Sequence, residues 1–109
     1  MYIETKQQTE LRLRIVDAIE EVTGVPRELW EIRRTRSKEE VMIRHIYINM
    51  LYNTKQFTLK TIAKIVGLKN HCTILQSIDR VKSWQDSDEF DAERTLYNYI
   101  KEEYEQRNS

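Results

Sequence analysis

Residues that permit tight turns are scarce in this chain, and that scarcity constrains its fold more than any other feature. Its 109 residues include 2 glycines and 1 proline. Sandwiches and barrels need many turns with special backbone angles, so this supply argues against them. Apolar residues instead recur at three- and four-residue spacing, the period of amphipathic helices. We therefore expect a compact all-α protein, and its length fits one domain, residues 1–109.

Capping residues divide the apolar pattern into about six predicted helices. Gly24 can end the first helix in a left-handed cap, and Pro26 can open the second. Ser37 and Glu40 have the spacing of a capping box. The predicted helices cover residues 7–22, 26–32, 38–53, 59–66, 71–84 and 89–105, with N-caps at Thr58 and Asn70 and fraying expected from Gln106. The helix over 38–53 is apolar nearly all round, which predicts a central position. The inner stripe of 71–84 is predicted to be Ile74, Leu75, Ile78 and Val81.

Several classes of function are disfavoured by what the sequence lacks. One cysteine allows neither an intramolecular disulfide nor a Cys-rich zinc site. Gly24 and Gly67 stand far apart, so no glycine-rich loop can cradle a nucleotide. His45 and His71 have no Cys or carboxylate partner at ligand spacing. We expect no metal, no nucleotide or other cofactor, and no enzymatic activity.

The start of the chain and its short uncharged runs bear on location. Met1 precedes a charged, polar stretch, which predicts no signal peptide. The uncharged runs are far shorter than the roughly 18 residues of a membrane span. We expect a cytoplasmic protein that does not enter membranes.

A net charge of zero hides a strong segregation of charge along the chain. Residues 27–82 contain 12 basic and 5 acidic residues, whereas residues 83–109 contain 3 basic and 8 acidic residues. A basic segment can attract a polyanion even when the whole protein is neutral. The alternative is a solvated basic face that has no partner.

The segment 58–84 has the pattern of a helix-turn-helix, in which a second helix enters the DNA major groove. Ala63 is the small residue needed where the two helices cross, Gly67 supplies the turn, and Leu68 anchors it. The first positions of the second helix would then meet base edges. These positions are Lys69, Asn70, His71, Cys72 and Thr73. Arg33, Arg34 and Arg36 lie on a predicted basic loop, residues 33–37, which could enter the minor groove.

Three ordered motifs, within the stretch from Ile15 to about Ile100, resemble the C-terminal DNA-binding domain of the bacterial replication initiator DnaA. The family's Arg-Arg-Ser-Arg-Ser appears as Arg33-Arg34-Thr35-Arg36-Ser37. Its Ser-Leu-x-x-Ile-(Gly/Ala) appears as Thr58-Leu59-Lys60-Thr61-Ile62-Ala63. Its signature Gly-Arg-Asp-His-Thr-Thr-Val-Leu appears as Leu68-Lys69-Asn70-His71-Cys72-Thr73-Ile74-Leu75. The family's ATPase module has no counterpart here, so we expect a small stand-alone protein or an excised domain.

The resemblance implies a Trp-repressor-like helical domain that binds double-stranded DNA at DnaA boxes, TTATNCACA-like sites, in replication initiation or its control. It implies base contacts by Arg34, Lys69, Asn70, His71, Cys72 and Thr73, and backbone contacts by Arg33, Arg36, Arg44, His45, Thr58, Leu59 and Lys60. Lys69, Asn70 and Cys72 replace the family's Arg, Asp and Thr. Met42-Ile43-Arg44-His45 replaces its Arg-Pro-Arg-Gln. An altered box preference and weaker binding are both consistent with these departures.

Two other functions stay open at this point. The chain could be a protein-interaction module that kept the fold without the DNA site, using Trp30, Trp84 and the tyrosines as a partner surface and the acidic C-terminal helix to dock a basic partner. It could instead be a transcription repressor with a different operator. We expect a monomer, because the resembled domain binds as a single module; the alternative is a dimer that reads a palindrome.

Overall fold

The computed structural model describes residues 4–32, 37–68 and 70–108, and this part of the chain is helical without any strand. The all-α prediction is therefore confirmed. The elements are α1 (Lys6–Thr23), α2 (Arg27–Trp30), α3 (Lys38–Asn53), α4 (Leu59–Ile65), α5 (His71–Asp86), the short 3-10 helix η1 (Asp88–Phe90) and α6 (Asp91–Asn108).

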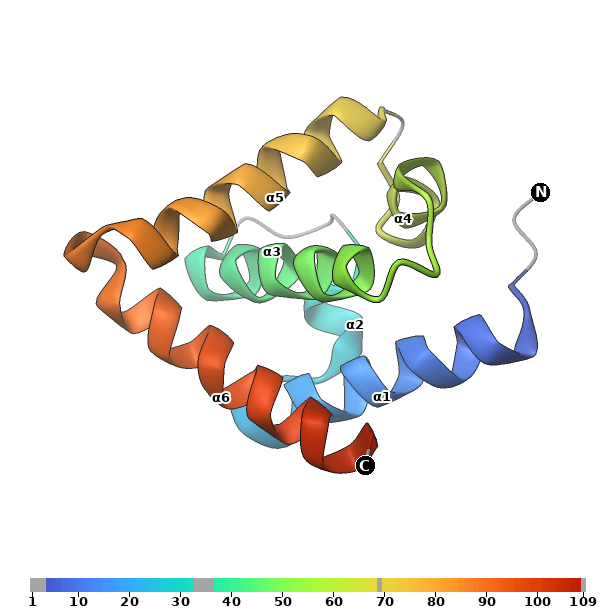
Figure 1. Ribbon diagram of the computed structural model, residues 1–109, viewed down its shortest axis with the longest axis horizontal. Helices are drawn as coiled ribbons and strands as arrows, with labels where there is room; N and C mark the ends of the chain where they lie inside the picture. The colour runs from blue at the N-terminus through green and yellow to red at the C-terminus, as the bar shows by residue number, and fades with distance from the viewer. Residues whose placement is uncertain (1–3, 33–36, 69, 109) are drawn as a thin grey trace.

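Helix α3 occupies the centre of the molecule, and the other helices are arranged around it (Figure 1). Helices α5 and α6 diverge from their connection at η1 and enclose α3 between them. Helix α4 lies at the N-terminal end of α5, while α1 packs along α6. The pair α4–α5 and the pair α1–α6 therefore lie on different sides of α3.

Local sequence signals explain most of the helix ends. The side chains of Thr58 and Asn70 accept hydrogen bonds from the backbone N–H groups of Thr61 and Cys72, as predicted. Gly24 ends α1 with a φ of 70°. Several helix bounds shift by one to three residues, and three features of the ends differ in kind from the prediction. Pro26 is the N-cap of α2 and not its first residue, Ser37 caps α3 without a side-chain capping hydrogen bond, and α6 continues through Gln106 to Asn108.

Burial confirms the central role predicted for α3, which contributes eight buried residues. Both tryptophans are buried as well, Trp30 against α3 and Trp84 on the inner face of α5. They are therefore part of the core and give no aromatic surface to a partner protein. None of the helices in the described part of the chain combines the length and apolarity needed to cross a lipid bilayer.

The inner stripe of α5 differs from the prediction at one position. Ile74 and Val81 are buried as expected, but Leu75 is 42% exposed. Ser77 is buried instead, because its hydroxyl oxygen lies 2.5 Å from Nδ1 of His45 on α3. A polar residue thus occupies the inner face of α5, and an apolar residue lies on its outer surface.

Gly67 lies in the turn before α5, and Gly24, at the end of α1, is its matched control. Both have positive φ, so Gly24→Ala and Gly67→Ala should each lower the free energy of unfolding by about 1–2 kcal/mol. A Cβ at Gly67 would lie 3.0 Å from Cγ2 of Ile32, whereas a Cβ at Gly24 meets nothing within 4 Å. Gly67→Ala should therefore lower the free energy of unfolding more than Gly24→Ala does. Urea unfolding of the two variants checks this order, and equal losses would mean that Ile32 moves away without cost.

Candidate nucleic-acid interface

Helices α4 and α5 pack against each other and are joined by a tight turn. Gly67 adopts a φ of 74°, which favours glycine, and the N–H of Leu68 donates to the carbonyl of Ala63 at 2.8 Å. Ala63 is buried and Leu68 packs on the edge of the core. Gly67 thus supplies the turn, and Ala63 and Leu68 face the core beside it.

The N-terminal end of α5 is exposed. Asn70, His71 and Cys72 are exposed, and Thr73 is half-buried. The Asn70 side-chain oxygen accepts from the Cys72 N–H at 2.8 Å, so the amide NH2 group supplies the remaining donors. The opposite side of α5 is buried in the core. Helix α5 therefore presents short polar side chains outward from a firmly packed helix.

Helix α4 adds two lysines to the same helix pair. Lys60 and Lys64 are exposed, as is the N-cap residue Thr58, whereas Leu59 packs against the core. Any contact that Leu59 makes with a ligand would therefore involve its backbone. Four predicted contact residues, Arg33, Arg34, Arg36 and Lys69, lie outside the described residues.

The charge of α4 and of the first two turns of α5 is one-sided. No acidic residue occurs between Glu40 and Asp79, although the chain has 18 acidic residues in all. The same stretch contains exposed lysines on α4, Lys60 and Lys64, and Lys55 in the segment before it. Its other basic residues are Arg44, which is buried on α3, and Lys69, which lies outside the described residues. A surface with cations and no carboxylates suits a phosphate-rich ligand.

Arg44 and His45, two of the expected phosphate contacts, hold α3 to its neighbours. Arg44 is 7% exposed, and its Nε donates to the carbonyl of Trp30 at 3.2 Å. Burial, together with the nearby cationic side chains of Arg80 and Arg44, lowers the pKa of His45 to about 4. His45 is therefore uncharged at neutral pH. Neither residue is an exposed cation beside α5, so the structure does not favour the phosphate contacts expected of them.

The lowered pKa of His45 predicts a loss of stability in mild acid. In the unfolded chain a histidine binds its proton near pH 6.5, while the folded protein resists protonation of His45 down to about pH 4. The stability due to neutral His45 is thus complete above pH 6.5 and is lost as the pH falls toward 4. The slope for one proton is at most about 1.4 kcal/mol per pH unit, and partial solvent exposure reduces it.

His45→Gln removes this titration and keeps a side chain that can hydrogen-bond to Ser77. Urea unfolding at pH 7, 5.5 and 4.5 should show a smaller acid loss for the variant than for the parent chain. Identical acid losses would mean that other groups cause the destabilisation.

A polar network that the sequence did not reveal fixes the chain immediately before the Arg33–Arg36 segment. The Glu31 carboxylate accepts from the Tyr47 hydroxyl at 2.6 Å and from Arg12 at 3.3 Å. Arg12 also pairs with Glu4 at 2.7 Å, and this hydrogen bond raises the pKa of the Arg12 guanidinium. Contacts between α1, α2 and α3 therefore hold the chain just before the basic segment. No periodicity in the sequence links these four residues.

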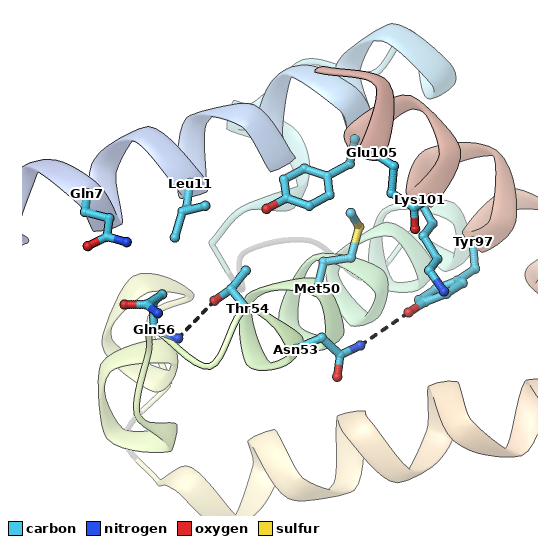
Figure 2. Close-up of a pocket in the computed structure, with 10 residues that line it drawn as sticks. Gln7, Leu11, Met50, Asn53, Thr54, Gln56, Tyr97, Lys101 and Glu105 are labelled. Carbon is cyan, nitrogen blue, oxygen red and sulfur yellow. Dashed lines mark hydrogen bonds between the residues drawn. The ribbon is translucent and has the colours of Figure 1, made fainter. Parts of the chain in front are cut away.

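A separate hollow of about 370 Å³ lies between α1, the end of α3 and α6 (Figure 2). Leu11 and Met50 line it, and the Tyr97 hydroxyl is held by Asn49 at 2.7 Å and by Asn53 at 3.5 Å. No residue of α4 or α5 lines it. Elsewhere in the described ranges, no group of three or more His, Cys, Asp or Glu side chains is placed to hold a metal ion.

No protein-family model matches this chain, and no curated protein or solved structure matches it either. A functional assignment therefore depends on the chain's own residues. Two exposed residues beside the predicted contacts, Lys64 and Gln76, were not identified from the sequence. Their four-residue spacing from Lys60 and Cys72 is the signal that could have found them.

Proposed function

We propose that the chain binds double-stranded DNA at DnaA-box-like sites, in replication initiation or its regulation, through the N-terminal end of α5. The observation that carries the proposal is the exposed polar end of α5 beside the lysines of α4, in a stretch without carboxylates. The sequence motifs around Arg34, Thr58 and His71 are the second support. The two supports are of different kinds, since one is geometric and the other is a resemblance.

In this proposal the first turn of α5 enters the major groove. The Asn70 amide and the His71 ring can donate to or accept from base edges, while Cys72 and Thr73 are small enough for close approach. The side chain of Lys60 and the backbone N–H groups at the start of α4 would meet phosphates. Arg34 would read the minor groove, as its position in the family motif implies.

The protein-interaction alternative loses the two tryptophans, because Trp30 and Trp84 are core residues, but it keeps the exposed tyrosines Tyr52 and Tyr99. A transcription repressor would use the same DNA surface and differ in its operator. The three hypotheses differ in the ligand that the protein binds, which is a DnaA box, another operator or a protein. A DNA-binding measurement therefore separates them.

Fluorescence anisotropy of the whole chain on a DnaA-box duplex and on a scrambled duplex, across a salt series, tests the proposal. We expect selective binding to the box, with an affinity that falls steeply as salt rises. Equal binding to both duplexes would contradict box recognition and direct attention to another operator. Absence of binding to both at low salt would overturn the DNA-binding proposal.

A further inference from the structure

A second hollow of about 370 Å³ lies between the end of α3, the later turns of α5 and α6. It adjoins the hollow of Figure 2, because Asn53, Tyr97 and Lys101 line both. A volume of this order can hold a small metabolite. The first residue of α5 that lines it is Ile78. A site here is therefore separate from the N-terminal end of α5 and does not depend on the proposed function.

The charge of this second hollow is opposite to that of the surrounding sequence. Lys82 of α5 and Lys101 of α6 line it. None of the described residues that line it is acidic, although several belong to residues 83–109, a stretch with 8 acidic residues. Neither lysine forms an ion pair with a carboxylate in the described part of the chain. Both ammonium groups are therefore available to an anionic ligand.

Asn49 supplies a hydrogen-bond donor that the protein itself does not use. It lines the second hollow and is 7% exposed. Its side-chain oxygen accepts from the Tyr97 hydroxyl at 2.7 Å and from the Asn53 amide at 2.9 Å. Among the described residues, no group accepts from its NH2 group. No fully enclosed side-chain nitrogen or oxygen in the same residues lacks a partner, so this NH2 group keeps access to the hollow.

The donors of the second hollow suit a phosphate group better than a carboxylate. Lysine binds phosphate as a point charge, whereas two-pronged recognition of a carboxylate favours arginine, and no arginine is among the described residues that line the hollow. A phosphate monoester has three terminal oxygens and about 1.5 to 2 negative charges near pH 7. It can therefore accept from two ammonium groups and from a buried amide at the same time.

The remaining lining residues suit a polar body attached to that phosphate. Gln85 and Asn98 are exposed carboxamides, which both donate and accept hydrogen bonds, as sugar hydroxyls do. Ile78 and Val81 give the hollow an apolar wall, against which the carbon face of a sugar ring can pack.

We propose that the second hollow binds a small sugar phosphate, with Lys82, Lys101 and the Asn49 NH2 group donating to the phosphate oxygens. The sugar hydroxyls would meet the amides of Gln85 and Asn98. This ligand satisfies the donor that the protein leaves without an acceptor, and a buried donor without a partner is otherwise costly.

Isothermal titration calorimetry of the whole chain tests the proposal. The probes are ribose 5-phosphate and glucose 6-phosphate, with ribose, glucose, inorganic phosphate and succinate as comparisons. The variants are Lys82→Gln and Lys101→Gln, which remove one charge each. Lys6→Gln is the matched control, because Lys6 is an exposed lysine on α1 and does not line the hollow.

We expect saturable binding of at least one sugar phosphate and none of its parent sugar. Lys82→Gln and Lys101→Gln should each weaken this binding by roughly tenfold, as expected for the loss of a hydrogen bond to a charged group. Lys6→Gln should bind like the parent chain.

Asn49→Asp tests the buried donor. The aspartate keeps an acceptor for Tyr97 and Asn53 but places a carboxylate at the hollow, so it should abolish binding of the sugar phosphate. Thermal unfolding checks that this variant is folded. If it does not fold, the two lysine variants, which change exposed residues, still decide the proposal.

Four outcomes would overturn the proposal. Neither sugar phosphate binds at millimolar concentrations, or both lysine variants bind as tightly as the parent chain. Tighter binding of succinate would show that the site takes carboxylates. Equally tight binding of inorganic phosphate would show that the sugar is not recognised.

Discussion

Trp30→Ala is expected to lower the free energy of unfolding by about 3–5 kcal/mol, the range seen when a large buried aromatic is truncated. The Trp30 side chain is fully buried, and its ring meets the ring of Tyr47 edge-on with centroids 4.9 Å apart. Its Nε1 donates to the carbonyl of Val25 at 2.9 Å. The substitution leaves a cavity and an acceptor without its partner.

The position of Trp30 gives a second reason for a large decrease in the free energy of unfolding. Its carbonyl accepts from Nε of Arg44, a buried cation on α3. If the backbone of α2 shifts toward the cavity, this hydrogen bond weakens, and a buried charged group with a weakened partner is costly. Loss of Trp30 is therefore expected to disturb the contact between α2 and α3 as a whole.

Leu29→Ala is the matched control, because Leu29 is the preceding residue of α2 and is 49% exposed. Leu29→Ala should lower the free energy of unfolding by well under half as much as Trp30→Ala. Urea unfolding measures both, provided that the m-values agree. If the two variants unfold at similar urea concentrations, α2 contributes little through Trp30 and the packing argument is wrong.

Replacing both lysines of α4, as Lys60→Ala with Lys64→Ala, is expected to give the largest loss of DNA affinity. Each lysine that neutralises a phosphate adds about 0.9 to the slope of log affinity against log salt. The double variant should therefore have a slope shallower by about 2. Its affinity should fall for the box and for the scrambled duplex alike, because phosphate contacts carry no sequence information.

Lys101→Ala is the control for this pair. Lys101 is an exposed lysine on α6 that borders the later turns of α5 and not its N-terminal end, and its loss changes the net charge without touching the candidate interface. The salt slope of this variant should match that of the parent chain. An unchanged slope in the double variant, or equal effects of all three lysines, would show that α4 does not face the DNA backbone.

The sequence predicted the helices well because the signals that determine them are local. The spacing of apolar residues and the caps Thr58, Asn70 and Gly24 depend on neighbours within one or two turns. The bounds predicted for α3 agree with those observed, and those of the other helices differ by a few residues. The turn between α4 and α5 was predictable for the same reason, since Ala63, Gly67 and Leu68 lie close together in the chain.

The failures concern residues whose partners lie on another helix. Ser77 is buried because His45 of α3 meets its hydroxyl, and no pattern within α5 reveals this. Leu75 was consequently expected on the inner face that Ser77 occupies. Arg44 was expected to contact phosphate because of its place in the family pattern, but it is 7% exposed and its Nε donates to the carbonyl of Trp30. The residues of the candidate site were predictable as positions on a helix, and so were the capping hydrogen bonds of Thr58 and Asn70. The burial of Arg44 and the contact between His45 and Ser77 were not.

Contact with α3 is common to α1, α2, α4, α5 and α6. With one shared helix at the centre, neither the α4–α5 pair nor the α1–α6 pair can separate without uncovering it, so the chain should unfold as a single cooperative unit. A ligand that binds only the folded form stabilises everything that unfolds with it. A duplex held at the end of α5 should therefore slow amide hydrogen exchange along α1 and α6, which do not touch it.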